Sequence, residues 1–396
     1  MAKNDPFAAL RFSQFRYFIT AQFLFTVAIL VQEVVISYYL YEITHDPLSL
    51  GLVGLLEAIP YISVALFGGY FADKYNKKTI YLLSFAAVLV GSVVLLWLTH
   101  SSNNHIFTPR EQIPIIYVVL FFLGFARGFY GPTWSSLKPF LVPAEHYSNS
   151  ASWSSQFWQT GMIVGPASAG FLYNWLGLSG TLTLVIGLLI LVVFVASLIS
   201  TKHIQLNKSS ISIFQSLKEG IVFVRTNRIL WYAILLDMFS VLFGGVVAIL
   251  PVFAKDILAV GPDGLGILRA APGIGAVLAM LGTAFFTPTH RPWRNMLIGV
   301  AGFGVATLVF AFSTNFWLSC AALFLTGAFD AISVVVRQTI LQVLPPDELG
   351  AFESGVAAKV LGAVPSVIFG GVMTLSIVTV LYARTKELFA VRLVRK

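Results

Sequence analysis

Long apolar runs separated by short polar segments make up most of the chain. A helix needs about 20 predominantly apolar residues to cross the hydrocarbon core of a bilayer. The pattern predicts spans at residues 17–41, 49–72, 79–99, 115–141, 152–174, 181–200, 229–253, 264–286, 295–312 and 316–344. The crowded region 349–383 is expected to hold two more. We therefore predict an all-α, polytopic membrane protein with twelve transmembrane helices.

The composition agrees with this pattern. Hydrophobic residues make up 57% of the chain, charged residues only 11%, and the mean hydropathy is +0.85. Soluble domains contain about 25% charged residues and already have too few polar residues to cover their surfaces. A cytosolic enzyme and a secreted domain are therefore excluded. The net charge of +8 does not indicate nucleic-acid binding, because the basic residues lie in short loops between apolar runs.

Several kinds of chemistry have no signal in the sequence. The chain has no Walker A sequence and no G-x-S-x-G motif, and its six histidines lie in loops or at span ends. The one cysteine, Cys320, cannot build a disulfide framework or a cysteine metal site. We expect no enzymatic activity, no cofactor, no metal and no nucleic-acid partner. No signal peptide is expected, because the N-terminus shows no cleavage site.

Basic residues predict the orientation of the spans. Of the 25 Lys and Arg residues, four lie within spans and only Arg110 and Lys255 fall in loops expected on the outside. The remainder lie in the loops and tails of the opposite side. The positive-inside rule then places both termini in the cytoplasm. We expect a multi-pass protein of the bacterial cytoplasmic (inner) membrane.

The two halves of the chain show an internal repeat. The matched residues are Gly124 with Gly327, Arg127 with Asp330, Pro143 with Pro346 and Glu145 with Glu348 at a shift of 203, and Glu57–Pro60 with Arg269–Pro272 at a shift of 212. Chance similarity among apolar helices is the alternative explanation. The repeat favours two pseudo-symmetric six-helix bundles in the same orientation, as in transporters whose halves rock around a central site. The expected domains are residues 1–200, a cytoplasmic linker at 201–228 with an amphipathic helix on the membrane surface, and residues 229–396.

The repeat also indicates that span 11 is incomplete. Relative to the first half, about 18 residues are absent between Glu348 and Leu349. The 36 residues from Glu348 to Arg384 are too few for two comfortable crossings and a turn. Either span 11 is shortened, or a segment is missing here. We favour the second and predict a broken or stretched join at 348–349.

The spans carry three distinctive motifs, Gly69-Tyr-Phe-Ala-Asp73-Lys74-Tyr-Asn76-Lys77-Lys78 after span 2, Arg127-x-x-Tyr130-Gly131 in span 4, and Gly161-x-x-x-Gly165-Pro166-x-x-x-Gly170 in span 5. Each of them resembles a motif of the major facilitator superfamily. Departures from the family pattern include Asn76, which replaces the usual turn glycine and can also adopt a positive φ. The segments Leu236-Asp237-Met-Phe and Leu250–Lys255 resemble the exporter branch that contains the enterobactin exporter and macrolide efflux pumps.

The resemblance implies roles for these motifs. In this superfamily the loop after span 2 resembles a latch that ties the halves together in one state, so Asp73 is a candidate gating residue. The span 5 motif resembles the antiporter motif of the family, and its glycine spacing permits close helix packing. Pro166 in that motif is either a hinge or a tolerated kink.

Ionisable residues inside spans are candidate functional sites, because burying a charge in the bilayer costs at least about 2.5–3.5 kcal/mol. The candidates are Glu33, Glu57, Arg127, Asp237, Arg269, Asp330, Arg337, Glu353 and Lys359. Their depths predict one cluster of Glu33, Glu57 and Arg127 and a second cluster of Asp237, Asp330 and Arg337. For Glu33 we favour proton coupling, in which burial stabilises the neutral acid and the approach of Arg127 releases the proton. The alternative is a permanent ion pair, but Gln22, Thr26, Glu33 and Ser37 fall on one helical stripe, which favours a polar cavity. Asp330 and Arg337 lie seven residues apart on one helix face, and a structural role is favoured for them.

A second set of side chains predicts a substrate cavity with aromatic walls and few polar groups, suited to amphipathic organic molecules. These residues are Gln22, Thr26, Tyr130, Trp134, Gln156, Gln159 and Ser240. The favoured function is proton-coupled secondary export of a drug-like or siderophore-like molecule by alternating access. The alternatives are a lysophospholipid-type transporter of the same fold and a non-transporting membrane receptor or sensor. The expected partners are the substrate, protons and the lipid bilayer, and a monomer is expected.

Overall fold

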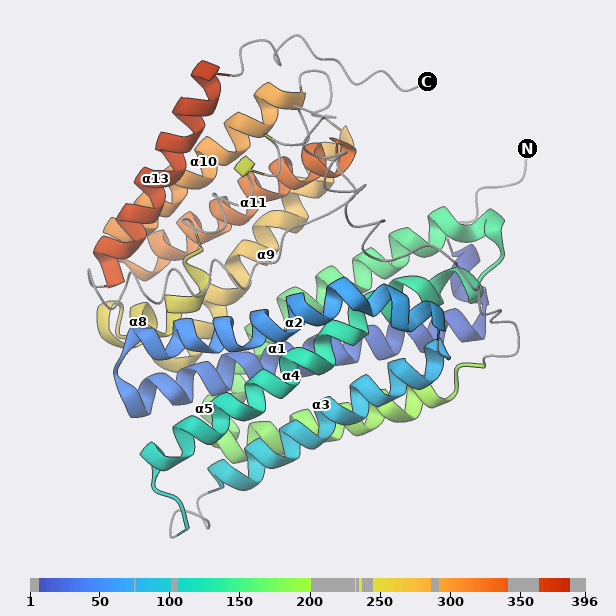
Figure 1. The fold of residues 1–396 in the computed structure, drawn as a ribbon. Coiled ribbons are helices and arrows are strands. Elements are labelled where there is room, and N and C mark those ends of the chain that lie inside the picture. Colours follow the sequence, from blue (N-terminus) through green and yellow to red (C-terminus); the bar gives the residue numbers. More distant parts are fainter. Residues whose placement is uncertain are drawn as a thin grey trace. The chain divides into compact units, whose positions relative to one another are not determined.

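The computed structural model describes residues 7–74, 76–100, 106–200, 232, 235–236, 245–285, 292–340 and 363–384 (Figure 1). All regular elements in these ranges are helices, as the apolar pattern predicts. The long helices are α1 (Ser13–Thr44), α2 (Pro47–Lys74), α3 (Lys77–Thr99), α4 (Pro109–Leu137), α5 (Tyr147–Ser197), α9 (Gly261–Phe285), α10 (Pro292–Phe312), α11 (Phe316–Ile340) and α13 (Ala363–Arg384). The short helices are η1 (Ala8–Arg11), η3 (Lys138–Phe140), η4 (Ala144–His146), η5 (Val247–Ile249), α8 (Leu250–Val252) and η6 (Phe253–Ile257), of which η6 is a π-helix.

Eight helices in the described residues are long and apolar enough to cross a membrane. One of them, α5, covers both of the spans predicted at 152–174 and 181–200. Its backbone breaks at Gly177, where φ is +65°. Residues with a side chain rarely adopt such a φ, so glycine lets the chain turn between the two halves of α5. The described helices establish a multi-pass membrane fold, and the predicted total of twelve spans is not confirmed.

Two local predictions are wrong, and capping explains both. The span predicted to begin at residue 115 begins earlier, at Pro109 of α4, because Thr108 and Glu111 form a capping box and proline suits the first helical turn. Asn76 was expected to tolerate a positive φ. Instead its φ is −60°, and its side chain accepts a hydrogen bond from the Lys78 backbone N–H at the start of α3. Asn76 is therefore an N-cap rather than a left-handed turn residue.

The chain divides into two compact units. The first consists of residues 1–39 and 56–213, and the second of residues 40–55 and 214–396. In the first unit α3 packs against α4 and α5, and in the second α11 packs against α9 and α10, with α13 on α10 (Figure 1). The core of the first unit includes the fully buried side chains Phe15, Phe18, Tyr81 and Phe85. In the second, Trp293 is the largest fully buried side chain and packs with Leu236, Met296, Leu297 and Val300.

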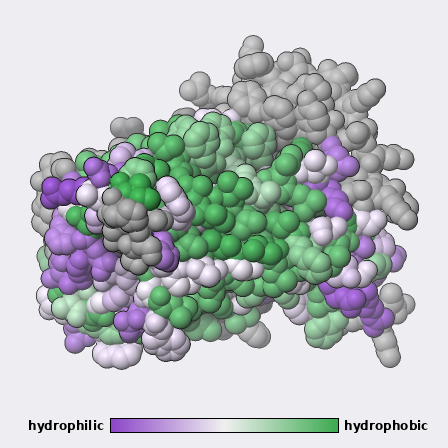
Figure 2. Space-filling model, turned by 90° about the horizontal axis from the view of Figure 1, so that it is seen from below, coloured by the Kyte–Doolittle hydropathy of each residue, from purple (hydrophilic) through white to green (hydrophobic). Residues whose placement is uncertain are grey.

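Large apolar side chains also cover much of the surface. Figure 2 shows a face on which hydrophobic side chains form a broad band between hydrophilic patches. Exposed members in the first unit include Leu83, Val90, Phe122 and Phe194. A water-soluble protein rarely exposes an apolar patch of this extent, whereas lipid chains cover it without cost.

Some predictions fall outside the described residues. They concern the amphipathic linker helix at 201–228, the join between Glu348 and Leu349, and most of the predicted span at 229–253.

Candidate functional site

Small residues bring α2 and α4 close together in the first unit. A Cβ atom added to Gly124 would lie 2.5 Å from the backbone oxygen of Glu57, and one added to Gly128 would lie 2.8 Å from Cβ of Val64. These separations are below van der Waals contact, so only glycine permits this approach. Close backbones of this kind are characteristic of small-residue packing between membrane helices. The α2–α4 packing places the side chains of Glu57 and Arg127 within reach of each other.

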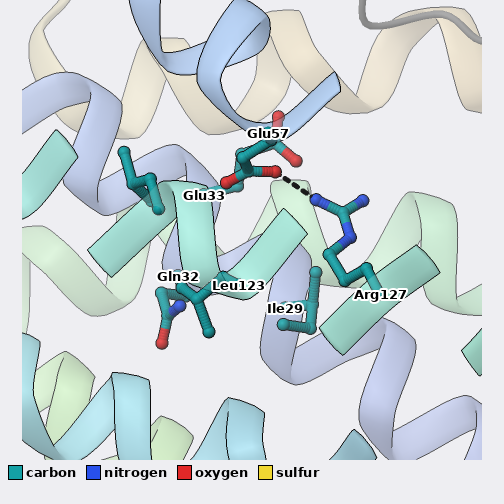
Figure 3. A pocket seen from close by; sticks show the side chains of 7 residues that line it. Ile29, Gln32, Glu33, Glu57, Leu123 and Arg127 are labelled. Carbon is teal, nitrogen blue, oxygen red and sulfur yellow. Dashed lines mark hydrogen bonds and ion pairs between the residues drawn. The ribbon is translucent and has the colours of Figure 1, made fainter. Parts of the chain in front are cut away.

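Glu57 and Arg127 form an ion pair. The Arg127 guanidinium donates a hydrogen bond to the Glu57 carboxylate (Figure 3). Glu57 is only 7% exposed, and the Arg127 side chain is 23% exposed. In a buried setting the attraction between the charges offsets the cost of removing them from water only when they are well paired. The pair therefore allows two charged residues to occupy transmembrane helices.

A small pocket surrounds this pair. It is lined by Ile29, Gln32, Glu33, Glu57, Leu120, Leu123 and Arg127. Glu33 extends from α1 to lie beside Glu57, so two carboxylates and one guanidinium share the site (Figure 3). The structure thus brings together the three residues of the first predicted cluster. The pocket has room for about one water molecule, so an organic molecule does not fit within it.

Gln32 is a polar lining residue that the sequence reasoning missed. Its side-chain oxygen accepts a hydrogen bond of 2.6 Å from the hydroxyl of Ser92, which ties α1 to α3. Both residues are buried, with exposures of 3% and 0%. Its position in the sequence, directly before Glu33 and one helical turn after Ile29, could have identified it as a lining residue. This hydrogen bond fixes the wall of the pocket opposite the ion pair.

The predicted polar stripe on α1 does not face one cavity. Of Gln22, Thr26 and Glu33, only Glu33 lines the pocket. The Thr26 hydroxyl donates to the backbone oxygen of Gln22, and its methyl group faces Gly161 of α5. Gln22 is 1% exposed, and its side-chain oxygen has no hydrogen-bond partner among the described residues. Thr26 is therefore a packing residue in this structure.

The aromatic residues predicted for the cavity belong to a buried cluster. The Tyr130 ring lies 4.8 Å from Phe25 and 5.9 Å from Tyr81, measured between ring centres. Trp134 stacks on Phe18 at 5.6 Å. The hydroxyl of Tyr81 and the indole N–H of Trp134 are buried and have no partner among the described residues. The cluster thus combines apolar ring faces with polar atoms available for hydrogen bonding.

The span 5 motif packs α5 against α1. A Cβ atom on Gly161 would lie 2.9 Å from Cγ2 of Thr26, and one on Gly165 would lie 2.9 Å from Cβ of Leu30. Pro166 and Gly170 are also buried within α5. The close packing predicted from the glycine spacing is present. Gln156 is exposed and Gln159 half-buried on α5, and neither lines the pocket described above.

Part of the loop motif after α2 is described. The backbone of Gly69, Asp73 and Lys74 belongs to the last turns of α2, whereas their side chains lie outside the described residues. Lys77 is buried, with an exposure of 4%. Lys78 donates a hydrogen bond of 2.7 Å to the backbone oxygen of Ser197 at the end of α5. A cation at a helix C-terminus interacts favourably with the helix dipole, so Lys78 joins α3 to α5 within the first unit.

The second predicted cluster is described only in part. Asp237 and Ser240 lie outside the described residues, as does the side chain of Arg337. Asp330 is exposed on α11. Arg269 of α9, a further predicted ionisable residue within a span, is 8% exposed. The proposed pairing of Asp330 with Arg337 is therefore untested.

A further group of polar residues lies in the second unit and was not predicted. The Tyr41 hydroxyl donates to the carboxylate of Asp256, and the ammonium group of Lys255 lies 5.9 Å from the centre of the Tyr41 ring. Both Lys255 and Asp256 belong to the π-helix η6. Within the described residues, no cluster of three or more metal-binding side chains occurs.

Comparison with known proteins identifies relatives over most of the chain. The family model described as Major Facilitator Superfamily matches residues 18–379. The uncharacterized MFS-type transporter YkuC of Bacillus subtilis is 23% identical over 362 residues, which cover 88% of this chain and 80% of that protein. The enterobactin exporter EntS of Escherichia coli is 23% identical over 368 residues, covering 90% of this chain and 84% of the exporter. Macrolide efflux protein A of Streptococcus pyogenes is 25% identical over 239 residues, covering 59% of this chain and 56% of that protein.

Solved structures share the fold. The nucleoside transporter NupG matches with a TM-score of 0.68 and 16% identity, covering 94% of this chain and 99% of that one. A POT family transporter in complex with a thioalcohol-conjugated peptide matches with a TM-score of 0.73 and 11% identity, covering 94% and 96%. At these identities the likeness concerns the fold alone.

Proposed function

This chain belongs to the Major Facilitator Superfamily, and on that premise we propose that it exports amphipathic small organic molecules in exchange for protons. Two relatives with efflux or exporter names support the direction of transport. We further propose that it works by alternating access, as a monomer in a bacterial cytoplasmic membrane with both termini in the cytoplasm. The substrate class is that of drugs or siderophores.

The three-charge pocket supports proton coupling. With both acids ionised, Glu33, Glu57 and Arg127 carry one net negative charge, and one bound proton makes the site neutral. Ionised groups inside a bilayer are costly, and they commonly mark proton pathways in transporters. The pocket has room for about one water molecule and none for a drug-sized molecule, so a proton is the species that it suits.

Glu33 is the proposed proton carrier. Glu57 is buried and already accepts a hydrogen bond from Arg127, which leaves Glu33 as the other carboxyl group of the pocket. Glu33 is half-buried on α1 and lines the same pocket. In the proposed cycle Glu33 takes up a proton when the site is open to one side of the membrane. Closure and reopening toward the other side bring the guanidinium closer to the carboxylate, which favours loss of the proton.

The aromatic cluster supports an amphipathic substrate. Tyr130 and Trp134 of α4 belong to a buried aromatic cluster, and Gln22 and Trp134 carry buried polar atoms that have no hydrogen-bond partner among the described residues. Ligand sites for small organic molecules combine apolar walls with a few polar groups in this way. Proton and substrate would therefore occupy neighbouring parts of the first unit, each suited to its own chemistry.

Transport in proteoliposomes tests the proposal. Purified protein is reconstituted with a pH-sensitive dye inside the vesicles, a pH gradient is imposed, and a macrolide, a catecholate siderophore or lysophosphatidylcholine is added. We expect the macrolide or the siderophore to produce proton flux that is lost in Glu33→Gln. The Glu33→Gln protein should still bind the compound, as measured by quenching of tryptophan fluorescence.

The other results are also decisive. Proton flux driven only by lysophosphatidylcholine would replace the drug or siderophore class with a lipid. If none of the compounds moves protons, antiport is wrong for this chain. Glu145→Gln is the matched control, because the side chain of Glu145 is 76% exposed and does not line the pocket.

A further inference from the structure

The packing of α9 on α11 repeats the packing of α2 on α4. A Cβ atom on Gly327 would clash with the backbone oxygen of Pro272, and one on Gly124 would lie 2.5 Å from the backbone oxygen of Glu57 and 2.7 Å from Cγ of Pro60. Gly327 is the repeat partner of Gly124, and Pro272 is the repeat partner of Pro60. Gly124 and its repeat partner Gly327 thus each lie against a backbone oxygen of the earlier helix, that of Glu57 in the first unit and that of Pro272 in the second.

Charged residues stand at the same distance from these contacts in both units. Arg127 and Asp330 each lie three residues after the glycine. Glu57 and Arg269 each lie three residues before the proline. Three residues are nearly one helical turn, so each charge occupies an equivalent place beside its crossing. The signs, however, are exchanged between the two units.

The burial of these residues is also matched. The charged residue on the earlier helix is buried in each unit, with 7% exposure for Glu57 and 8% for Arg269. The charged residue on the later helix is more open, since the Arg127 side chain is 23% exposed and Asp330 is exposed. Each unit therefore has a glycine crossing with a buried charged residue on the earlier helix and a more exposed charged residue on the later helix, and the signs of the two charges are exchanged between the units.

We propose that Arg269 and Asp330 form an ion pair between α9 and α11, as the charge-inverted counterpart of Glu57 and Arg127. The buried guanidinium of Arg269 requires an anionic neighbour in a transmembrane helix. Asp330 stands where the first unit holds the partner of Glu57. This assignment replaces the pairing of Asp330 with Arg337, which lies about 10.5 Å farther along the helix axis. In this arrangement the more exposed member of the pair is a carboxylate in the second unit and a guanidinium in the first.

Charge exchange in the full-length protein tests the pair. We expect Arg269→Gln and Asp330→Asn each to lower the apparent melting temperature in detergent by about 5 °C or more. The exchange Arg269→Asp with Asp330→Arg should recover at least half of the summed loss, because it restores opposite charges. Arg337→Gln should leave the melting temperature unchanged. The corresponding single and charge-exchanged variants of Glu57 and Arg127, whose ion pair is observed, show how large a change in melting temperature such a pair produces.

A second pair of substitutions keeps the test decisive if single variants do not fold. The variant Arg269→Met with Asp330→Leu removes both charges, and a paired site tolerates this better than either single loss. Recovery in either double variant supports the pair. If both double variants are as unstable as the sum of the singles, or if Arg337→Gln and Asp330→Asn show the coupling instead, the proposal is overturned.

Discussion

Two helix crossings in the first unit are both made by glycines, but only one of them has charged residues beside it. The α2–α4 crossing is made by Gly124 and Gly128, and the α1–α5 crossing by Gly161 and Gly165. The first brings an ion pair together beside a small pocket, whereas the nearest groups at the second are the Thr26 and Leu30 side chains. Close packing is therefore not itself the candidate site. Charges placed beside one crossing distinguish it from the other.

The largest effect on stability is expected from Arg127→Leu. This change removes the cation that faces the buried Glu57 carboxylate, and loss of one member of a buried pair costs about 3–5 kcal/mol. Thermal unfolding in detergent measures the loss. The double variant Glu57→Leu with Arg127→Leu should recover most of it, because no uncompensated charge remains. Equal losses in the single and double variants would show that the pair contributes little to the α2–α4 crossing.

A smaller loss is expected from Gly124→Ala. The new methyl group would lie 2.5 Å from the backbone oxygen of Glu57, and no side-chain change can relieve that clash. The helices must separate, at a cost of about 1–3 kcal/mol for overpacking. Adding Pro60→Ala should not restore stability, since the backbone contact remains. Restoration by Pro60→Ala would mean that the proline ring, rather than the backbone, limits this crossing.

The corresponding change at the other crossing, Gly161→Ala, should cost about 1 kcal/mol, at the lower end of the same range. Here the nearest atom is Cγ2 of Thr26, at 2.9 Å, which belongs to a side chain. Thr26→Ser removes that atom and should recover part of the loss. Recovery at α1–α5 and none at α2–α4 would sharpen the distinction between the two crossings. Thr26→Ser alone is the control.

Gly187→Ala is expected to have the smallest effect. A Cβ atom on this glycine meets nothing within 4 Å. Alanine is favoured over glycine inside a helix by about 0.5–1 kcal/mol, so stability should stay unchanged or rise slightly. Unfolding under the same detergent conditions provides the measurement. A clear loss of stability here would indicate that alanine substitution destabilises α5 for reasons other than crowding.

The sequence was sufficient to predict the membrane helices that the structure describes and the first charged cluster. Apolar runs locate membrane helices because the bilayer imposes both a length and a hydrophobicity on them. The depth of Glu33, Glu57 and Arg127 along their spans follows from the helical rise per residue, and these residues do line one pocket. Depth, however, does not reveal which neighbouring helix a side chain faces.

That limit explains the residues that sequence reasoning placed wrongly or missed. The stripe of Gln22, Thr26 and Glu33 defines a helix face, yet Thr26 packs against a glycine of α5 while Glu33 lines the pocket. Gln32 lies next to that stripe, and its side chain lines the pocket while it accepts a hydrogen bond from Ser92 of α3. Asn76 can either cap a helix or adopt a left-handed turn, and the hydrogen bond to Lys78 selects the cap.

The break at Gly177 affects the depth at which the two halves of α5 lie in a bilayer. Trp175 and Leu176, directly before the break, are 77% and 48% exposed. No Lys or Arg lies between Tyr173 and Thr183 to fix this turn at the membrane surface by charge. Indole rings favour the headgroup region of the bilayer, so Trp175 is the interfacial anchor that sets the depth of the turn at Gly177 in the membrane.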